Sequence, residues 1–291
     1  MNVKELNIVR KVKGGFLVLK SLANSWTGLR AHQQMLDIAA HNLANVNTVA
    51  YKEKRVSFAD LPARNLAERR LPVAGEPPTP VRSGRGVVLS SVTSSYEEAP
   101  LDFTGNNFDL AVAGEGYLRV IMPDGSYAYT RAGNFALDAE GNIVTANGRP
   151  LDLHLTVDSW GGVDLSTLEI TPGGEIYARS MEEAGLPGPG YSPHAAVKLG
   201  EVPLYRFVNP QGLSYIGDNL VLPSAASGPP LEGRAGEEGF GVIRQGFLEK
   251  ANVDLGRQMV MLIRGQRALQ ASARTAVTAD ELWALTLNVQ S

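Results

Sequence analysis

Two stretches with the spacing of heptad helices lie near the two ends of the chain, and they restrict the possible fold more than any other feature. In the first stretch apolar residues follow one another in steps of four and three, with polar Gln33 in the one missing place. The same steps recur before the C-terminus. We therefore expect a long helix near each end, with a seam formed by Leu22, Trp26, Leu29, Leu36 and Leu43 and by Met259, Leu262, Leu269, Ala276 and Trp283.

Small and polar residues in these stretches indicate close contacts between helices. Gly265 lies in the middle of the C-terminal stretch, where a glycine costs about 1 kcal/mol relative to alanine. Such a cost favours a position where another helix approaches closely, so Gly265 joins the residues expected to pack. Gln266 and Asp280 place polar groups in the seam, where they can fix its register. Two interpretations stay open, since the helices can pack only on each other or also against neighbouring subunits.

The composition changes between the two helical stretches. Residues 61–86 are rich in Pro, Arg and Gly, which is typical of a loop. Beyond them, alternating apolar and polar residues predict β-strands, and turn pairs such as Asp124-Gly125 and Asn147-Gly148 predict hairpins. The middle of the chain is therefore expected to be rich in β-structure.

We expect an α+β fold in which the N- and C-terminal helices form a coiled-coil-like helical domain and a β-rich domain is inserted between them. The expected division is an N-terminal extension over residues 1–20, the N-terminal helix over 21–60, a Pro- and Gly-rich loop over 61–95, the β-rich domain over 96–225, a return linker over 226–250 and the C-terminal helix over 251–291.

Charge and composition exclude several classes of protein. The chain has 27 Lys and Arg against 30 Asp and Glu, a net charge of −3, so we expect no nucleic-acid partner. The longest aliphatic run, residues 259–263, is far shorter than the roughly 20 residues of a membrane span. The run FLVL near the start is too short for a cleaved secretory signal, and Lys20 interrupts it. The absence of cysteine excludes disulfides, thiolate metal sites and a thiol nucleophile.

Candidate catalytic and metal-binding residues lack the spacing that such sites need. His32 and His41 are nine residues apart and face opposite sides of a helix, so they cannot bind one ion together. Asp138 and Asn142 resemble part of a calcium loop but lack its closing Glu, and they indicate a hairpin turn instead. Adjacent carboxylates are more often solvated surface than an acid–base pair, which applies to the doublets Glu97-Glu98, Glu182-Glu183 and Glu237-Glu238. We expect no enzymatic activity, no cofactor and no metal.

Three asparagines end the first helical stretch, in the sequence HNLANVNTVAYK at residues 41–52. Asparagine is a poor helix former that favours caps and turns. The amides of Asn42, Asn45 and Asn47 can bond backbone groups that are freed where the helix ends, and they can also bond a neighbouring subunit. The two roles are compatible, and the helix is expected to stop here.

The same segments carry a resemblance to a known family. Residues 21–52, SLANSWTGLRAHQQMLDIAAHNLANVNTVAYK, resemble the N-terminal motif of the bacterial flagellar axial proteins of rod and hook. NNFDLAVAGEGYLRV is similar to the central β motif, FVNPQGLSYIGDNL to the stretch before the C-terminal region, and QGFLEKANVDLGRQMVMLIRGQRALQ to the C-terminal helix motif. SFADL and IGDNL most resemble the distal rod members. The family motif usually has Gly at the position of Ala50, so the sequence leaves open whether a tight turn forms there.

The resemblance implies a structural subunit of the flagellar basal-body rod, in its distal part, that self-assembles into a helical tube and transmits torque from motor to hook. Its implied partners are further copies of the chain, other rod and hook proteins and the flagellar export apparatus. The implied location is the basal body outside the cytoplasmic membrane, after export without a cleaved signal peptide. A proximal rod or hook-type axial protein is the nearest alternative, and a soluble dimeric adaptor is an alternative from a different class.

Overall fold

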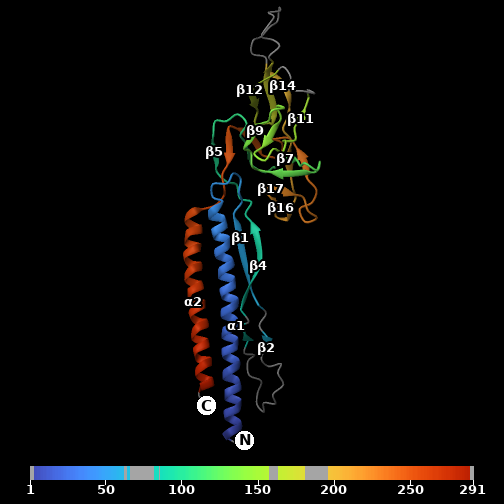
Figure 1. The fold of residues 1–291 in the computed structure, drawn as a ribbon. Coiled ribbons are helices and arrows are strands. Elements are labelled where there is room, and N and C mark those ends of the chain that lie inside the picture. The colour runs from blue at the N-terminus through green and yellow to red at the C-terminus, as the bar shows by residue number, and fades with distance from the viewer. Residues whose placement is uncertain are drawn as a thin grey trace, which may run out of the picture. The chain divides into compact units, whose positions relative to one another are not determined.

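The computed structural model of the protein describes residues 3–61, 64–65, 82–84, 86–156, 163–180 and 196–288, and the chain divides into two compact units (Figure 1). Unit 1 consists of Met1–Ala44, Lys54–Thr93 and Asp254–Ser291, and unit 2 consists of Asn45–Glu53 and Ser94–Val253. Both long helices belong to unit 1, and most strands belong to unit 2. Two helices that flank a β-rich region confirm the predicted α+β class.

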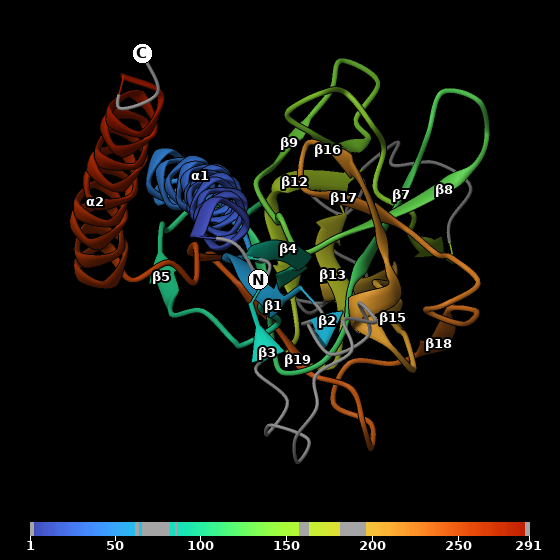
Figure 2. The same ribbon diagram turned by 90° about the horizontal axis from the view of Figure 1, so that it is seen from below.

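Unit 1 combines the two terminal helices with a pair of strands. Its elements are α1 (Val3–Ala44), α2 (Leu255–Asn288), β1 (Lys54–Asp60), β2 (Arg64–Asn65), β3 (Arg82–Ser83) and β4 (Val87–Ser94). β1 pairs with β4, and β2 pairs with β3. Figures 1 and 2 both show α1 between α2 and the β1–β4 pair. Helix α1 therefore has packing partners on two sides within unit 1.

The helices α1 and α2 run antiparallel. Asn42, near the end of α1, bonds Gln258, near the start of α2. Further along, Leu36 lies against Gly265, and Gly28 lies near Ser272. Residue numbers fall along α1 as they rise along α2, so the chain returns beside its own first helix. Neither helix, over the residues that the structure describes, has an apolar stretch long enough to span a bilayer.

Helix α1 is longer at its start and shorter at its end than the predicted range of residues 21–60. It begins at Val3, within the expected extension over residues 1–20, and it ends at Ala44. Turns follow, and the residues from Lys54 to Asp60 form β1. Alternate Val56 and Phe58 favour a strand there, because β-branched and aromatic side chains fit a pleated surface. The expected loop over residues 61–95 likewise contains β4, which pairs with β1.

Unit 2 is built from short strands in small sheets. Its strands are β5 (Leu101–Phe103), β6 (Leu110–Ala113), β7 (Leu118–Ile121), β8 (Tyr127–Thr130), β9 (Phe135–Leu137), β10 (Ile143–Thr145), β11 (His154–Leu155), β12 (Val163–Ile170), β13 (Glu175–Ser180), β14 (Ala196–Glu201), β15 (Leu204–Arg206), β16 (Ser214–Gly217), β17 (Leu220–Leu222), β18 (Leu231–Gly233), β19 (Val242–Gln245) and β20 (Phe247–Glu249), with the short helix η3 (Pro210–Gly212) before β16. Two sheets have four strands, in the orders β16-β17-β8-β7 and β11-β14-β13-β12. Two-stranded antiparallel pairs β10-β9, β15-β18, β19-β6 and β20-β5 complete the unit.

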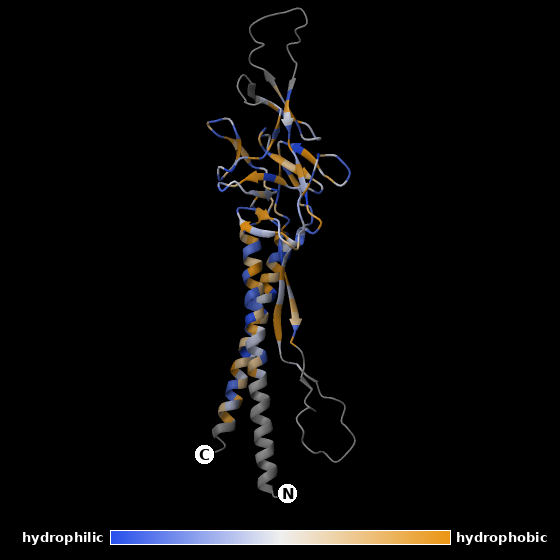
Figure 3. Cartoon of the chain, turned by 90° about the vertical axis from the view of Figure 1, so that its right-hand side faces the viewer, coloured by the Kyte–Doolittle hydropathy of each residue, from blue (hydrophilic) through white to orange (hydrophobic). Residues whose placement is uncertain are grey.

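The core of unit 2 is apolar and draws residues from several sheets. Leu118, Ile176, Leu204, Leu220 and Ile243 come from five different strands, and each is at most 2% exposed. Figure 3 shows stretches of hydrophobic residues, in orange, in the β-rich part of the chain. A second cluster is aromatic, with edge-to-face rings, and contains Tyr117, Tyr129, Tyr205 and Phe207. Burial of this much apolar surface is the dominant stabilising term in a domain of this size.

The expected return linker over residues 226–250 contains strands of this unit. β18, β19 and β20 all lie in this range, and Ile243 of β19 belongs to the core. β19 pairs with β6 and β20 pairs with β5. Strands of three or four residues are too short to show a reliable period-2 pattern, and glycines separate them, so the sequence is typical of a linker.

Candidate functional site

The surface of α2 that contacts α1 contains a column of small and polar residues spaced seven positions apart. Gln258, Gly265 and Ala279 are buried, and Ser272 is half-buried. Half-buried residues follow each member of the column four positions later, at Leu262, Leu269, Ala276 and Trp283. A seven-residue repeat keeps one side of a helix directed at its partner. Small residues in the column allow the two backbones to come close.

The two helices approach each other closely at Gly265. A Cβ atom at this position would lie 2.7 Å from Leu36 Cδ2 and 3.0 Å from Met35 Cε. Any side chain larger than hydrogen would therefore displace these neighbours. One heptad earlier, Asn42 Nδ2 donates a hydrogen bond to Gln258 Oε1 at 3.3 Å. A buried amide pair in a helix contact is a device that fixes register.

The seam residues predicted from hydrophobicity lie partly outside this contact. Leu22, Leu29, Leu36 and Leu43 are half-buried. Trp26 is 69% exposed, and Met259 is 49% exposed although it directly follows buried Gln258. The column on α2 is thus shifted by one residue from the apolar steps, because a hydrophobicity pattern gives little weight to Gly, Ser and Gln. Pairing of the coiled-coil type stays a prediction.

The three asparagines of the helix-end motif differ in their surroundings. Asn42 is buried, its Nδ2 donates to the Lys54 carbonyl at 2.8 Å, and its Oδ1 accepts from the Lys54 N–H at 2.9 Å. One side chain thus satisfies both backbone groups of the first residue of β1. Asn45 Oδ1 accepts a hydrogen bond from the Thr48 hydroxyl at 3.2 Å in the turn after α1. Asn47 is exposed, and its contact with a neighbouring subunit stays a prediction.

Ala50 makes the tight turn that the sequence left open. Its φ of 55° lies in the left-handed region, and its N–H donates to the Glu249 carbonyl at 2.7 Å. This conformation costs an L-residue about 1–2 kcal/mol. Alanine therefore keeps the turn of the motif, with the surrounding contacts of unit 2 holding it in place.

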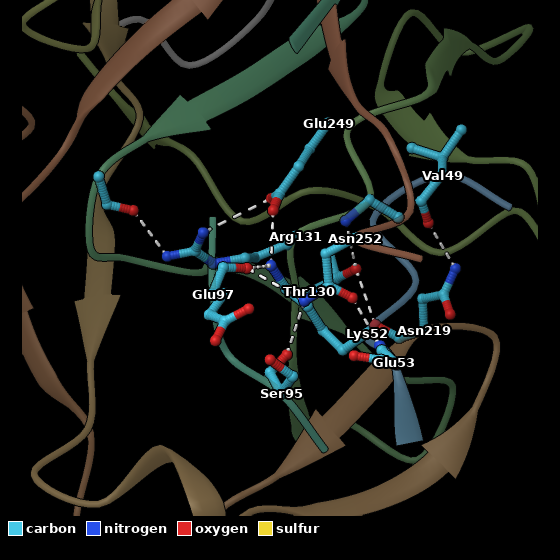
Figure 4. A network of polar contacts seen from close by, with 12 residues as sticks. Val49, Lys52, Glu53, Ser95, Glu97, Thr130, Arg131, Asn219, Glu249 and Asn252 are labelled. Carbon is cyan, nitrogen blue, oxygen red and sulfur yellow. Dashed lines mark hydrogen bonds and ion pairs between the residues drawn. The ribbon is translucent and has the colours of Figure 1, made fainter. Parts of the chain in front are cut away.

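Unit 2 holds the segment from Asn45 to Glu53 through a buried group of charges (Figure 4). Lys52 Nζ lies 2.6 Å from Glu249 Oε1, and these side chains are 7% and 2% exposed. Arg131 Nη1 lies 3.5 Å from Glu249 Oε2, and Arg131 Nη2 donates to the Gly114 carbonyl at 2.7 Å. Lys52 Nζ also donates to the Glu97 carbonyl at 3.1 Å. Because buried charges are costly without partners, each of these groups depends on the others.

Asn252 extends this group of contacts to three separate passes of the chain. Its Oδ1 accepts from the Glu53 N–H at 2.6 Å, and its Nδ2 donates to the carbonyls of Ser95 and Glu97 at 2.9 and 3.2 Å. Figure 4 shows these bonds together with the one from Asn219 Nδ2 to the Val49 carbonyl at 2.7 Å. We call Lys52, Glu53, Glu97, Arg131, Glu249 and Asn252 the anchoring network. It ties together the segments of unit 2 that are next in sequence to unit 1.

Burial changes the acid–base properties of several side chains in unit 2. Burial lowers the pKa of Lys52, against the opposing effect of the Glu249 carboxylate. Burial also raises the pKa of the Tyr51 phenol to about 12 and raises the pKa of Tyr117 and Tyr205 in the aromatic cluster. These phenols therefore stay protonated over the physiological range.

Where the chain is described, the structure shows the surroundings of several residues that could be considered for catalysis or metal binding. Asp138 Oδ1 accepts from the Asn142 N–H at 2.6 Å between β9 and β10, which confirms the predicted hairpin turn. His154 lies at the surface, 3.4 Å from Glu232. Among the described residues, no cluster of three or more His, Asp or Glu could hold a metal ion. The doublet Glu182-Glu183 lies outside the described residues.

The spacing of residues in the sequence does not predict the anchoring network. Lys52 and Glu249 are 197 positions apart, and no local spacing connects them. The available signal was that Lys52, Glu249 and Asn252 all lie in segments that carry the family resemblance. Nothing within those segments alone indicates which of these residues pair with one another.

Three family models match parts of the chain. Residues 22–52 match the flagella basal body rod protein family, and residues 111–178 match the D1 domain of flagellar hook protein FlgE/F/G. Residues 244–289 match the C-terminal part of the flagellar basal body rod FlgEFG proteins. The first and last of these matches contain α1 residues of the helix contact, all of α2 and, from the anchoring network, Lys52, Glu249 and Asn252.

Curated relatives match over almost the whole chain. The relative from Agrobacterium fabrum is 32% identical over 267 residues, which is 91% of this chain and 97% of the relative. The relative from Caulobacter vibrioides is 32% identical over 276 residues, 94% of this chain and 100% of the relative. The relative from Bacillus subtilis is 32% identical over 271 residues, 91% and 97% of the two chains. All three are named flagellar basal-body rod protein FlgG, and the chain belongs to this family of structural rod subunits.

Proposed function

We propose that the chain is a distal rod subunit whose copies stack into an open helical tube and transmit torque from motor to hook. When one surface of a subunit binds a different surface of the next copy, the contacts close into a ring only if the rotation between copies permits it. Otherwise the contacts extend into a helical assembly. The proposal rests on one observation above others, which is the exposed apolar side of α2.

This side of α2 lies away from the contact with α1. Ile263 is two residues before Gly265, and two steps of about 100° turn it to nearly the opposite side of the helix. Ile263 is 51% exposed. Other exposed apolar residues of α2 extend the uncovered surface, namely Leu255, Met259, Val260, Val277, Leu282 and Leu285. Apolar residues that gather on the exposed surface of a helix mark a surface that another chain covers.

Neighbouring copies cover this surface with their own terminal helices. Packing of the coiled-coil type then extends from the α1–α2 contact of one chain to the next chain, with the exposed Trp26 at the edge of the contact. The terminal helices line the inside of the tube, and the β-rich units form its outside. The anchoring network supports a role under load, because it holds the chain segments next to unit 1 through buried charges and amides.

Other rod and hook proteins and the flagellar export apparatus are further partners of the chain under this proposal. The protein reaches the basal body outside the cytoplasmic membrane through that apparatus, without a cleaved signal peptide. Support comes from the family, whose relatives are named as basal-body rod proteins.

The substitution Ile263→Asp tests the proposal. A carboxylate on the covered side of α2 would lose its hydration without gaining a partner, so we expect truncated rods without hook or filament in electron micrographs of isolated basal bodies, and cells that do not swim. Circular dichroism of the purified variant should show that unit 2 is still folded.

Val208→Asp is the matched control. Val208 is 78% exposed and lies in unit 2, so the same chemical change there should leave complete rods. Complete rods with Ile263→Asp would contradict the proposed role of α2. A discrete dimer of the wild-type chain in sedimentation, with no rod in cells, would favour the adaptor alternative.

A further inference from the structure

Two tyrosines of unit 2 meet through their hydroxyl groups. The Tyr215 hydroxyl donates a hydrogen bond to the Tyr96 hydroxyl at 3.1 Å, across 119 positions of the sequence. Tyr215 is 45% exposed and lies on β16, at the edge of its four-stranded sheet. Tyr96 is half-buried and lies between β4 and β5. The two phenols are therefore in contact at a place where solvent reaches one of them.

The backbone holds both tyrosines in this position. The carbonyls on the two sides of Tyr96 accept hydrogen bonds from Asn252 Nδ2, at 2.9 and 3.2 Å. Tyr215 faces Val221 in the antiparallel pair of β16 and β17. Two groups that a fold holds in contact react with each other far more readily than the same groups free in solution. The fold thus prepares the two phenols for a reaction with each other.

Two phenols in contact are the reactants of oxidative coupling. Loss of one electron and one proton from each phenol gives two phenoxyl radicals, whose unpaired electrons spread onto the ring carbons ortho to the hydroxyl group. A C–C bond between two ortho carbons joins the rings, and the hydrogen on each coupled carbon is transferred to the oxygen of its own ring. The tyrosines are oxidised by the loss of two hydrogen atoms in all. Hydrogen peroxide takes up the two electrons and two protons and is reduced to two molecules of water.

The contact between Tyr96 and Tyr215 suits this reaction. Each ortho carbon is two bonds from its hydroxyl oxygen, so the reacting carbons are close together when the hydroxyls touch. A hydrogen bond between the hydroxyls lets a radical on exposed Tyr215 take the hydrogen atom of half-buried Tyr96. Burial raises the pKa of the Tyr96 phenol, and the hydrogen bond with Tyr215 acts in the same direction. Tyr96 therefore keeps its proton over the physiological range.

Other described tyrosines lack this combination of contact and access. The rings of Tyr129 and Tyr205 lie 5.3 Å apart, but these residues are only 3% and 1% exposed, so an oxidant in solution does not reach them. Tyr127 is 47% exposed, and its ring lies against the Arg119 guanidinium rather than another phenol. Access and contact occur together at Tyr96 and Tyr215.

We propose that Tyr96 and Tyr215 form an oxidative cross-linking site, at which hydrogen peroxide converts the hydrogen-bonded pair into a dityrosine within one chain. The new bond ties β16 to the segment that Asn252 holds. A cross-link between distant positions stabilises a fold mainly because it constrains the unfolded chain. Since the chain has no cysteine, this pair offers a covalent link that a disulfide cannot supply.

Oxidation of the purified whole chain, at low concentration, with hydrogen peroxide and a haem peroxidase tests the proposal. We expect dityrosine fluorescence and a product whose mass is lower by two hydrogen atoms. Oxidation of methionine instead adds oxygen, so the mass separates the two reactions. After digestion with trypsin, peptide 86–119 should be joined to peptide 207–234, which contains Tyr215. Fragmentation should place the link at Tyr96 and not at Tyr117 of the same peptide.

Tyr215→Phe removes one hydroxyl and keeps the ring, so we expect loss of the cross-link. Tyr127→Phe is the matched control, because Tyr127 is as exposed as Tyr215, and the cross-link should form there as in the wild type. Far-ultraviolet circular dichroism checks that each variant is folded. If Tyr215→Phe does not fold, Tyr96→Phe removes the other hydroxyl of the pair and should also abolish the cross-link.

Three results would overturn the proposal. They are the absence of dityrosine from the oxidised wild type, a link between peptides 86–119 and 207–234 that persists in folded Tyr215→Phe, and dityrosine that forms only between separate chains. None of these results depends on whether the chain assembles into a rod, so the proposed function is tested separately.

Discussion

Units 1 and 2 differ in what they bury. Unit 2 buries large aliphatic and aromatic side chains such as Leu204, Ile176 and Tyr205. In unit 1 the buried side chains are small or polar where described, namely Ala31, Ala39, Ala279, Ser25, Asn42 and Gln258, while apolar residues such as Ile263 are exposed. Unit 2 therefore contains the apolar burial that a self-supporting domain needs, whereas unit 1 leaves apolar side chains of α2 uncovered.

The two units also differ in charge. Unit 1 has 17 Lys and Arg against 8 Asp and Glu, a formal net charge of +9, whereas unit 2 has 10 against 22, a net charge of −12. Like charge on the helical units of separate copies makes these units repel each other in solution. The overall charge of −3 conceals this division.

The largest expected difference between the units is their response to high pH. All nine tyrosines lie in unit 2. Burial raises the pKa of Tyr51 to about 12 and raises the pKa of Tyr96, Tyr117 and Tyr205 above the unperturbed value of 10. The unfolded state then releases these protons first, so the free energy of unfolding of unit 2 is unaffected below pH 10 and falls as the pH rises towards 12.

Absorbance at 295 nm measures this titration, and tyrosine circular dichroism measures the unfolding of unit 2. The lowered pKa of Lys52 acts in the opposite sense, but one group cannot offset several phenols. We expect tyrosinate to appear cooperatively with unfolding of unit 2, while the helical signal at 222 nm changes little. Tyrosinate that forms near pH 10 in a folded unit 2 would contradict this difference between the units.

The sequence predicted the two helices of unit 1 but not the long-range polar pairs of either unit. Heptad spacing indicated both terminal helices, and the cost of a mid-helix glycine indicated a close contact at Gly265, which the structure contains. Helix periodicity is a local property, so a single sequence displays it. The pairs Lys52–Glu249 and Asn42–Gln258 join residues about 200 positions apart, and their partners depend on how distant segments fold together. Asn42 was selected as a helix-end residue, and its partners Lys54 and Gln258 were not predictable.

Glu249→Gln should produce the next largest effect, confined to unit 2. The substitution leaves Lys52 and Arg131 buried without their counter-charge, and breaking a buried ion pair typically costs about 3–5 kcal/mol. Urea unfolding followed by tyrosine circular dichroism measures the loss. The control Asp102→Asn removes a carboxylate from the exposed pair with Lys250, which should change stability by less than about 1 kcal/mol. Equal losses in the two variants would show that the anchoring network adds no stability.

Gly265→Val should have the smallest effect on the monomer and should act on unit 1 alone. Valine would place its Cβ 2.7 Å from Leu36 Cδ2, and overpacking of this kind costs about 1–3 kcal/mol. Thermal melting at 222 nm should shift downward, whereas the tyrosine signal of unit 2 should melt unchanged. At Gly256 the nearest atom is 3.4 Å away, on the exposed Asp254 side chain, so Gly256→Val serves as the control.

The same variant connects the monomer to assembly. If small residues are required where helices meet, a modest decrease in the melting temperature of the monomer should accompany complete loss of rods in electron micrographs. The reason is that every added copy repeats the displaced contact. Normal rods from Gly265→Val would show that α1 and α2 separate or rearrange on assembly. A loss of the tyrosine signal would show that unit 2 depends on the helices for its fold, which would remove the main difference between the two units.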